Sequence, residues 1–102
     1  MFRVDVTYVP EVVGDLTAWL RTVTMSRAAA EQFAILYWSS LRQHLIDYRG
    51  IPPDALLIDS AKRLYRIPFL GKTRIEYRII DQRRWFRIRR REVEVPSFYP
   101  VR

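Results

Sequence analysis

Apolar and polar residues alternate at the start of the chain. Phe2, Val4, Val6 and Tyr8 are each separated by one polar residue, and the alternation stops at Pro10. A period of two places the four apolar side chains on the same face of a strand, and a proline removes the next backbone donor. The pattern therefore predicts a first strand with one buried face.

Helical spacing replaces the alternation after Pro10 and predicts two helices. The first is short, and its apolar positions are Val13, Leu16, Leu20 and Val23. The second is longer, with Ser26 as a favourable N-cap and Gly50 beyond its end. Its expected core stripe consists of Ala30, Phe33, Ala34, Tyr37, Leu41, Leu45 and Tyr48. The two helices are expected to form a hairpin that lies on a sheet.

Three further strand patterns occupy the second half of the chain. Pro52 and Pro53 cannot continue a helix, so residues 50–61 are expected to be a surface connection. Hairpin connections are expected at Gly71-Lys72 and at Asp81-Gln82-Arg83. The three predicted strands are residues 64–69, 73–81 and 84–91.

These elements predict an α+β fold for residues 1–102, taken as a single domain. The expected order is strand, helix, helix, strand, strand, strand (β-α-α-β-β-β), with the two-helix hairpin packed on one face of a small antiparallel meander. The side chains expected to face the helices are Ile75, Tyr77, Ile79, Phe86 and Ile88. The side chains expected on the opposite, open face are Arg74, Glu76, Arg78, Trp85, Arg87 and Arg89.

Basic residues are concentrated in these last strands. Of the 18 lysines and arginines in the chain, twelve lie in residues 62–91, together with only two acids, Glu76 and Asp81. This segment carries a net charge of +10 in a chain of net charge +7, so the remaining residues are net acidic. A cationic sheet face suits a polyanion, and nucleic acid is the first candidate.

Residue types that support other chemistries are scarce. The chain has no cysteine and one histidine, His44, which excludes disulfides and thiolate chemistry and argues against a metalloenzyme. We therefore expect neither a metal nor a cofactor, and a structural role for His44. No apolar run approaches the roughly 20 residues of a membrane-spanning helix, and no signal-peptide core follows the start, so we expect a cytoplasmic protein without a membrane partner.

Three segments between residues 64 and 93 share a pattern with a known family. They read Leu64-Tyr65-Arg66-Ile67, Gly71-Lys72-Thr73-Arg74-Ile75-Glu76-Tyr77-Arg78-Ile79-Ile80-Asp81 and Arg89-Arg90-Arg91-Glu92-Val93. In this pattern and in its element order, the chain resembles the RelE/ParE superfamily of bacterial toxins. The resemblance implies a toxin encoded beside a cognate antitoxin that neutralises it.

The resemblance leaves three functions open. Toxins of the RelE type enter the ribosomal A site and cut mRNA there, so a ribosome-dependent mRNA endonuclease is the first expectation. Toxins of the ParE type poison DNA gyrase without catalysis. The third alternative is a nucleic-acid-binding or partner-binding module that keeps the fold without toxicity. The expected partners are the antitoxin and either mRNA on the ribosome or DNA gyrase.

The resemblance also implies four catalytic residues. Carried over by position, they are Arg66, Arg74, Arg90 and, in the C-terminal tail, Tyr99. Pro68 stands where the family has a second basic residue and Glu94 where it has a tyrosine, and both departures favour the gyrase-directed branch. The further basic residues expected to contact nucleic acid are Lys62, Arg63, Lys72, Arg78, Arg87 and Arg89.

Cleavage of RNA through its 2′-hydroxyl needs a base for that group, an acid for the leaving 5′-oxygen and cations for the phosphate. Arginine meets the last need, because its guanidinium fork matches phosphate oxygens and stays charged. Arginine is a poor base for the same reason, so the base is open among Tyr99, Glu76, Glu94 and a ribosomal group. Simpler roles are open as well: the arginines could form a solvated face, Arg90 could bind an antitoxin carboxylate, and Trp85 could stack on a base or cover a sheet edge.

Overall fold

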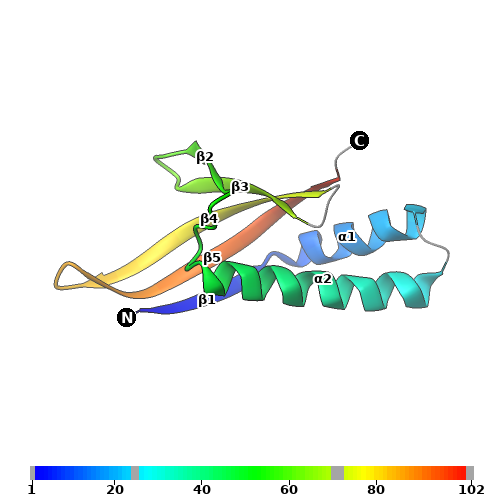
Figure 1. The fold of residues 1–102 in the computed structure, drawn as a ribbon, viewed down its shortest axis with the longest axis horizontal. Coiled ribbons are helices and arrows are strands. Elements are labelled where there is room, and N and C mark those ends of the chain that lie inside the picture. Colours follow the sequence, from blue (N-terminus) through cyan, green and yellow to red (C-terminus); the bar gives the residue numbers. More distant parts are fainter. Residues whose placement is uncertain (1, 24–25, 70–72, 101–102) are drawn as a thin grey trace.

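The computed structural model describes residues 2–23, 26–69 and 73–100, which form an α+β fold. Two helices and five strands follow one another in these ranges (Figure 1). They are β1 (Arg3–Tyr8), α1 (Pro10–Val23), α2 (Arg27–Asp47), β2 (Leu56–Asp59), β3 (Leu64–Phe69), β4 (Thr73–Arg84) and β5 (Arg87–Pro100). The predicted order is confirmed, and β2 is an additional short strand inside the segment expected to be a surface connection.

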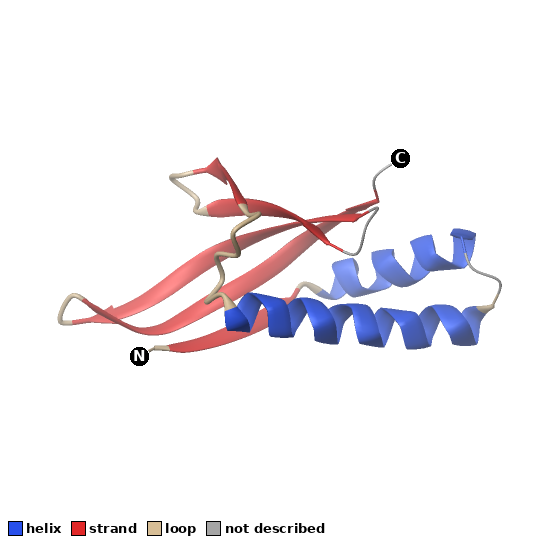
Figure 2. Ribbon diagram, viewed as in Figure 1, coloured by secondary structure: helices blue, strands red, loops and turns tan. Residues whose placement is uncertain are grey.

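All five strands form one sheet in the order β1-β5-β4-β3-β2. Strands β2 to β5 are successive antiparallel neighbours, which confirms the predicted meander, and β1 joins it in parallel with β5. The helices lie side by side and cover one face of the sheet (Figures 1 and 2). The opposite face has no helix over it in the part of the chain that the structure describes, and we call it the open face.

A hydrophobic core fills the space between the helices and the sheet. Ile75, Tyr77 and Ile79 of β4 point into it, as predicted, and none is more than 3% exposed. The hydroxyl of Tyr77 donates to the carbonyl oxygen of Gly50 at 2.7 Å. The hydroxyl of Tyr77 therefore keeps a hydrogen-bond partner although the phenol is buried. Burial raises the pKa of Tyr77 well above its ordinary value.

The core stripe of α2 differs in part from the prediction. Ser26 caps the helix as expected, with its Oγ accepting from the backbone amide of Ala29 at 3.1 Å. Phe33 and Tyr48, however, are 46% and 47% exposed, and Trp38 is buried instead. The prediction was wrong for these two residues because Phe33 lies at the margin of the stripe and Tyr48 follows the last helical residue.

The buried row of α1 is shifted in the same way. Val12, Leu16 and Leu20 are buried, whereas the predicted core residues Val13 and Val23 are 39% and 58% exposed. Residues four apart lie above one another on a helix, so the buried row follows the interval 12, 16, 20. Of the four core positions predicted for this helix, only Leu16 and Leu20 are therefore buried.

The hairpin between β4 and β5 is longer than predicted. β4 continues past Asp81, where a turn was expected, and the chain reverses at Trp85-Phe86. The polar triplet was misleading because Asp81 pairs with Arg91 inside the ladder. Phe86 and Ile88 were expected to face the helices, but Phe86 is 97% exposed and Ile88 pairs with Arg83 near the end of the hairpin, which projects beyond the helices (Figure 1). β5 also runs on to Pro100, so the expected tail is a strand.

Candidate functional site

Charged side chains on the open face pair with one another across the strands. The register places Arg66 opposite Glu76, and Arg78 opposite Glu94. Arg66 donates to Glu76 Oε1 from Nε at 3.2 Å and from Nη2 at 2.7 Å, and Arg78 Nη2 donates to Glu94 Oε1 at 2.9 Å. Opposite charges on facing strand positions stabilise the sheet and cancel each other locally.

Asp5 makes a third group of this kind at the edge of the sheet. Its Oδ2 accepts from Arg90 Nε at 2.6 Å, and its Oδ1 accepts from Arg3 Nε at 3.0 Å. Burial would raise the pKa of Asp5, but the hydrogen bonds and charges of the two arginines outweigh it and hold the pKa below its ordinary value. The carboxylate is therefore ionised at neutral pH and offsets part of the charge of Arg3 and Arg90.

The open face is nearly neutral as a result over the stretch from Arg74 to Gln82 of β4 and the neighbouring strands. In this stretch of the described strands, five arginines on the open face are matched by four carboxylates. The arginines are Arg3, Arg66, Arg74, Arg78 and Arg90, and the carboxylates are Asp5, Glu76, Glu92 and Glu94. For this stretch the expectation of a strongly cationic face was wrong, because three of these acids lie outside residues 62–91 in the sequence and reach the face only through strand pairing.

Three of the four residues implied as catalytic meet at one corner of the open face. Arg74 lies directly opposite Tyr99 of β5 and opposite Pro68 of β3, and Arg66 is its diagonal neighbour. Directly opposite neighbours have Cβ atoms about 5 Å apart, and diagonal neighbours are about 7–8 Å apart, with a somewhat shorter distance between their Cβ atoms. Arg74 has no side-chain hydrogen bond or ion pair with any described residue. We call Arg66, Arg74 and Tyr99 the Arg74 corner.

A shallow pocket of about 310 Å³ borders the Arg74 corner. Its lining residues are Asp54, Leu56, Arg66, Pro68 and Arg74. Asp54 belongs to the connection between α2 and β2, and its Oδ1 is 4.0 Å from His44 Nε2. Asp54 was not predicted as a site residue, because no local pattern in the sequence shows that this connection folds back against β3.

The fourth implied catalytic residue, Arg90, lies elsewhere. Its partner on β4 is Gln82, and the separation from position 74 to position 82 is about 26 Å at roughly 3.3 Å per strand residue. Arg90 is also held by Asp5 at 2.6 Å. The structure therefore does not bring Arg90 and Arg74 to the same phosphate.

The other basic residues expected to contact nucleic acid do not form one surface. The connection between β2 and β3 holds Lys62-Arg63, Arg78 is paired in the middle of the open face, and Arg87 and Arg89 lie near the end of the β4–β5 hairpin. Lys72 falls outside the described residues. These positions therefore do not form one continuous surface for nucleic acid along the sheet.

Asp81 anchors a buried ion cluster beside the core. Its carboxylate accepts from Arg91 Nε at 2.8 Å, from Arg91 Nη2 at 3.0 Å and from Arg63 Nη1 at 2.6 Å. The side chains of Asp81 and Arg91 are only 3% and 9% exposed, and the Arg91 guanidinium lies 4.7 Å from the centre of the Phe2 ring. Burial would raise the pKa of Asp81, but the two arginines outweigh it and hold the pKa below its ordinary value. These two residues of the family-like pattern therefore serve the fold.

The arrangement offers no group of metal ligands. Within residues 2–23, 26–69 and 73–100, no three side chains of histidine, aspartate or glutamate lie close enough together to hold a metal ion. No helix in those ranges is long and apolar enough to cross a membrane.

Comparisons of the chain with protein-family models, curated proteins and solved structures find no match. Function has to be inferred from the side chains themselves.

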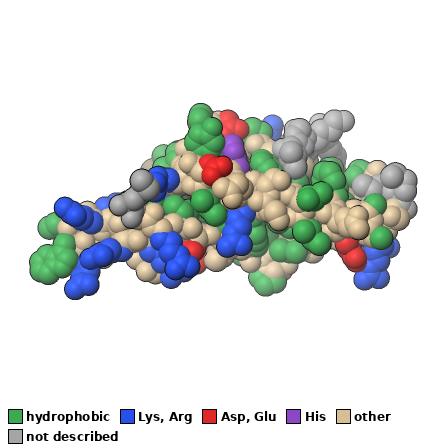
Figure 3. Space-filling model, turned by 60° about the horizontal axis from the view of Figure 1, so that its bottom comes forward, with side chains coloured by type: hydrophobic (Ala, Val, Ile, Leu, Met, Phe, Trp, Pro, Cys, Tyr) green, Lys and Arg blue, Asp and Glu red, His purple; other side chains and the backbone are tan. Residues whose placement is uncertain are grey.

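Unpaired basic charge gathers at the end of the β4–β5 hairpin. Basic side chains surround hydrophobic ones at the left end of the molecule in Figure 3. Arg84, Arg87 and Arg89 have no side-chain partner among the described residues, and Arg83 Nη2 approaches Asp81 only to 3.9 Å. The positive charge predicted for the open face is therefore found at this projecting end.

Proposed function

We propose that the chain is the toxin of a toxin–antitoxin module and cuts RNA at the Arg74 corner. Two findings support the proposal: the RelE/ParE-like pattern of residues 64–93, and the meeting of Arg66, Arg74 and Tyr99 on adjacent strands. The observation that carries it is the Arg74 guanidinium, which has no side-chain partner among the described residues and lies directly opposite a phenol and beside a pocket of about 310 Å³. A phosphate diester fits this arrangement because a guanidinium fork matches two phosphate oxygens.

In the proposed reaction, the 2′-oxygen of RNA loses its proton and attacks the adjacent phosphorus. The bond to the 5′-oxygen breaks, and a 2′,3′-cyclic phosphate remains. Arg74 stabilises the growing negative charge on the phosphate oxygens, and Arg66 joins it when a phosphate competes with Glu76 for its guanidinium. The Tyr99 hydroxyl gives its proton to the leaving 5′-oxygen.

The positions of the carboxylates narrow the choice of base. Glu94 is bonded to Arg78 and lies five positions before Tyr99 on β5, a separation of about 16 Å. Asp54 lines the pocket and Glu76 lies beside Arg66. Among the carboxylates of this chain, the proposed acceptor for the 2′-hydroxyl proton is Asp54 or Glu76, and Asp54→Asn and Glu76→Gln distinguish the two. If neither variant lowers the cleavage rate, the base is a ribosomal group.

The surface next to the Arg74 corner suits a protein partner. β2 is the edge strand of the sheet, and its residues Leu56, Leu57 and Ile58 are 65%, 52% and 44% exposed. An edge strand offers unpaired backbone groups to a second chain. We expect the antitoxin to supply apolar residues for β2 and carboxylates for Arg74, and so to cover the corner.

The position of Arg90 favours a second candidate, a protein that binds its target without catalysis. The resemblance implies three arginines at the phosphate, but Arg90 lies about 26 Å along the sheet from Arg74 and is paired with Asp5. The target in this case is DNA gyrase, or a nucleic acid or protein bound by a non-toxic module of the same fold.

Cleavage mapping on translating ribosomes tests the proposal. The wild-type protein should cut mRNA in the ribosomal A site, and Arg74→Ala should leave the mRNA intact. Arg78→Ala is the matched control, because it also removes an open-face arginine but not one at the corner. Intact mRNA with the wild-type protein would contradict the proposal. Inhibition of gyrase supercoiling by the same preparation would then support the second candidate.

A further inference from the structure

We propose that the end of the β4–β5 hairpin is a second, separate binding site, and that its ligand is a single-stranded segment of nucleic acid. We call this site the hairpin tip and define it as Arg84, Trp85, Phe86, Arg87 and Arg89. It shares no residue with the Arg74 corner. From position 74 to position 84 of β4 the distance is about 33 Å, so the two sites bind different parts of any ligand.

The turn at the tip contains residues that a turn of this kind disfavours. Trp85 and Phe86 both have positive φ, 54° and 67°. Two-residue hairpin turns with two positive φ values strongly prefer Asn-Gly or Asp-Gly, because bulky side chains crowd the backbone there. Outliers of this type concentrate at functional sites, where the surroundings impose the conformation for another reason.

Burial does not provide that reason. Trp85 is 81% exposed and Phe86 is 97% exposed, so neither ring contributes appreciably to the core. Burial of the rings within the protein therefore does not offset the strain of the turn. An external ligand that covers the rings would bury this apolar area and so offset the strain.

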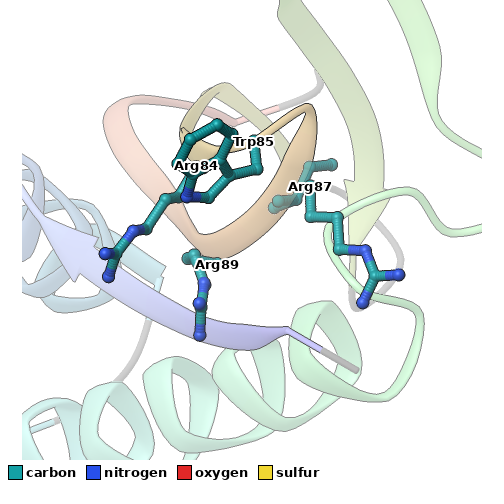
Figure 4. A pocket seen from close by; sticks show the side chains of 5 residues that line it. Arg84, Trp85, Arg87 and Arg89 are labelled. Carbon is teal, nitrogen blue, oxygen red and sulfur yellow. The ribbon is translucent and has the colours of Figure 1, made fainter.

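The cations beside the rings indicate which ligand this is. Arg84, Arg87 and Arg89, together with Trp85 and Ile88, line a pocket of about 410 Å³. In Figure 4 the guanidinium groups of the three arginines point away from the hairpin, with Arg84 and Arg87 on opposite sides of it. None has a side-chain partner among the described residues. Their charges are thus available to an anion that extends around the tip.

Single-stranded nucleic acid combines the two features that the hairpin tip matches. Its phosphates meet arginine forks, and its unpaired bases present flat faces on which aromatic rings stack. In a duplex those faces are covered by neighbouring base pairs, so the rings would gain less. An acidic protein would meet the arginines but offers no regular series of flat rings to Trp85 and Phe86.

This inference needs only a nucleic-acid partner and does not depend on cleavage. The two proposals can therefore fail separately. Loss of cleavage in Arg74→Ala concerns the corner, whereas binding of a ligand that cannot be cleaved concerns the tip.

Fluorescence anisotropy with a labelled deoxythymidine strand of about 12 nucleotides, within the range of single-strand site sizes, provides the test. This strand has no 2′-hydroxyl and cannot be cut through it. The first variant is Trp85→Asn with Phe86→Gly, which removes both rings and installs the favoured turn residues. We expect affinity to fall at least about tenfold, while the midpoint of urea unfolding stays unchanged or rises.

The second variant replaces Arg84, Arg87 and Arg89 with glutamine. The slope of log affinity against log salt should become shallower by about 2, because a single strand contributes roughly 0.7 per phosphate contact. The control replaces Arg21, Arg27 and Arg42, exposed residues of the helices, with glutamine and makes the same change in net charge. Its affinity should change by less than about threefold, since distant charges are screened.

Three results would overturn the proposal. The first is wild-type affinity in both tip variants, and the second is a control triple variant that weakens binding as much as the tip variant does. The third is tighter binding of the matching duplex than of the single strand. Anionic lipid vesicles serve as a further probe: a blue shift of tryptophan emission that vesicles cause and the oligonucleotide does not, and that is lost in the variant Trp85→Asn with Phe86→Gly, would also reject nucleic acid as the ligand.

Discussion

Replacing Asp81 with asparagine removes the negative charge that pairs with two arginines beside the core. Asp81 receives three hydrogen bonds from Arg91 and Arg63, and Arg91 is itself only 9% exposed. An asparagine keeps one acceptor oxygen but leaves the buried guanidinium of Arg91 without a counter-charge. Breaking a buried ion pair on one side costs about 3–5 kcal/mol, and we expect Asp81→Asn to lower the free energy of unfolding by about 3 kcal/mol.

The pH dependence of stability follows from the same cluster. The folded-state pKa of Asp81 lies below its ordinary value, so the unfolded chain binds this proton more tightly than the folded chain. The contribution of Asp81 to stability is therefore complete above the unfolded pKa of about 3.9 and is lost as the pH falls through the folded pKa. Asp81→Asn should lack this part of the acid-induced loss of stability.

Urea unfolding at neutral and acid pH measures both effects. Glu94→Gln is the matched control, because it breaks the more exposed pair with Arg78 and should cost less than about 1 kcal/mol. If the free energy of unfolding of Asp81→Asn lay within about 0.5 kcal/mol of the wild-type value, the usual range for surface substitutions, the pair of Asp81 and Arg91 would not stabilise the fold. The two family-like residues would then have to be considered for function.

Two further predictions concern groups in or beside the core. Gly50→Ala should lower the free energy of unfolding by at least about 1 kcal/mol, because Gly50 has a φ of +86° and an added Cβ would lie 3.1 Å from Val93 Cγ2; unchanged urea unfolding would contradict this. Burial raises the pKa values of Tyr8 and Tyr37 to about 12, so their stabilising contribution is present below pH 10 and is lost as the pH rises through about 12. A spectrophotometric titration should show these tyrosines ionising late, and ionisation of all six tyrosines of the chain near pH 10 with the fold intact would refute this.

Local pattern was sufficient to predict much of the fold. The strand at residues 64–69, the cap at Ser26 and the core-facing row Ile75, Tyr77 and Ile79 were all predicted correctly. Each depends on spacing within one element, and spacing is visible in the sequence. The turn of the β4–β5 hairpin was missed because Trp85-Phe86 contains none of the residues that usually form turns. The nearby triplet Asp81-Gln82-Arg83 is polar and was predicted as the turn instead.

The candidate site depends on contacts that local pattern does not contain. The charge of the open face was overestimated because the carboxylates that neutralise it, such as Asp5 and Glu94, come from other strands. Asp54 reaches the pocket from a connection with no regular periodicity. The turn of the β4–β5 hairpin was predicted to begin at Asp81 but lies four residues further on. The register of this longer hairpin separates Arg90 from Arg74.

The most direct test of the proposed function compares Arg74→Ala with Arg90→Ala in single-turnover cleavage of mRNA on translating ribosomes. Arg74 has no side-chain partner in the described part of the chain, whereas Arg90, about 26 Å away along the sheet, is bonded to Asp5. We predict that Arg74→Ala lowers the cleavage rate by about 10²-fold or more, as removal of one preorganised donor does, and that Arg90→Ala changes it by only a few fold. Equal losses in the two variants, or a loss in Arg90→Ala alone, would contradict an active site at the Arg74 corner.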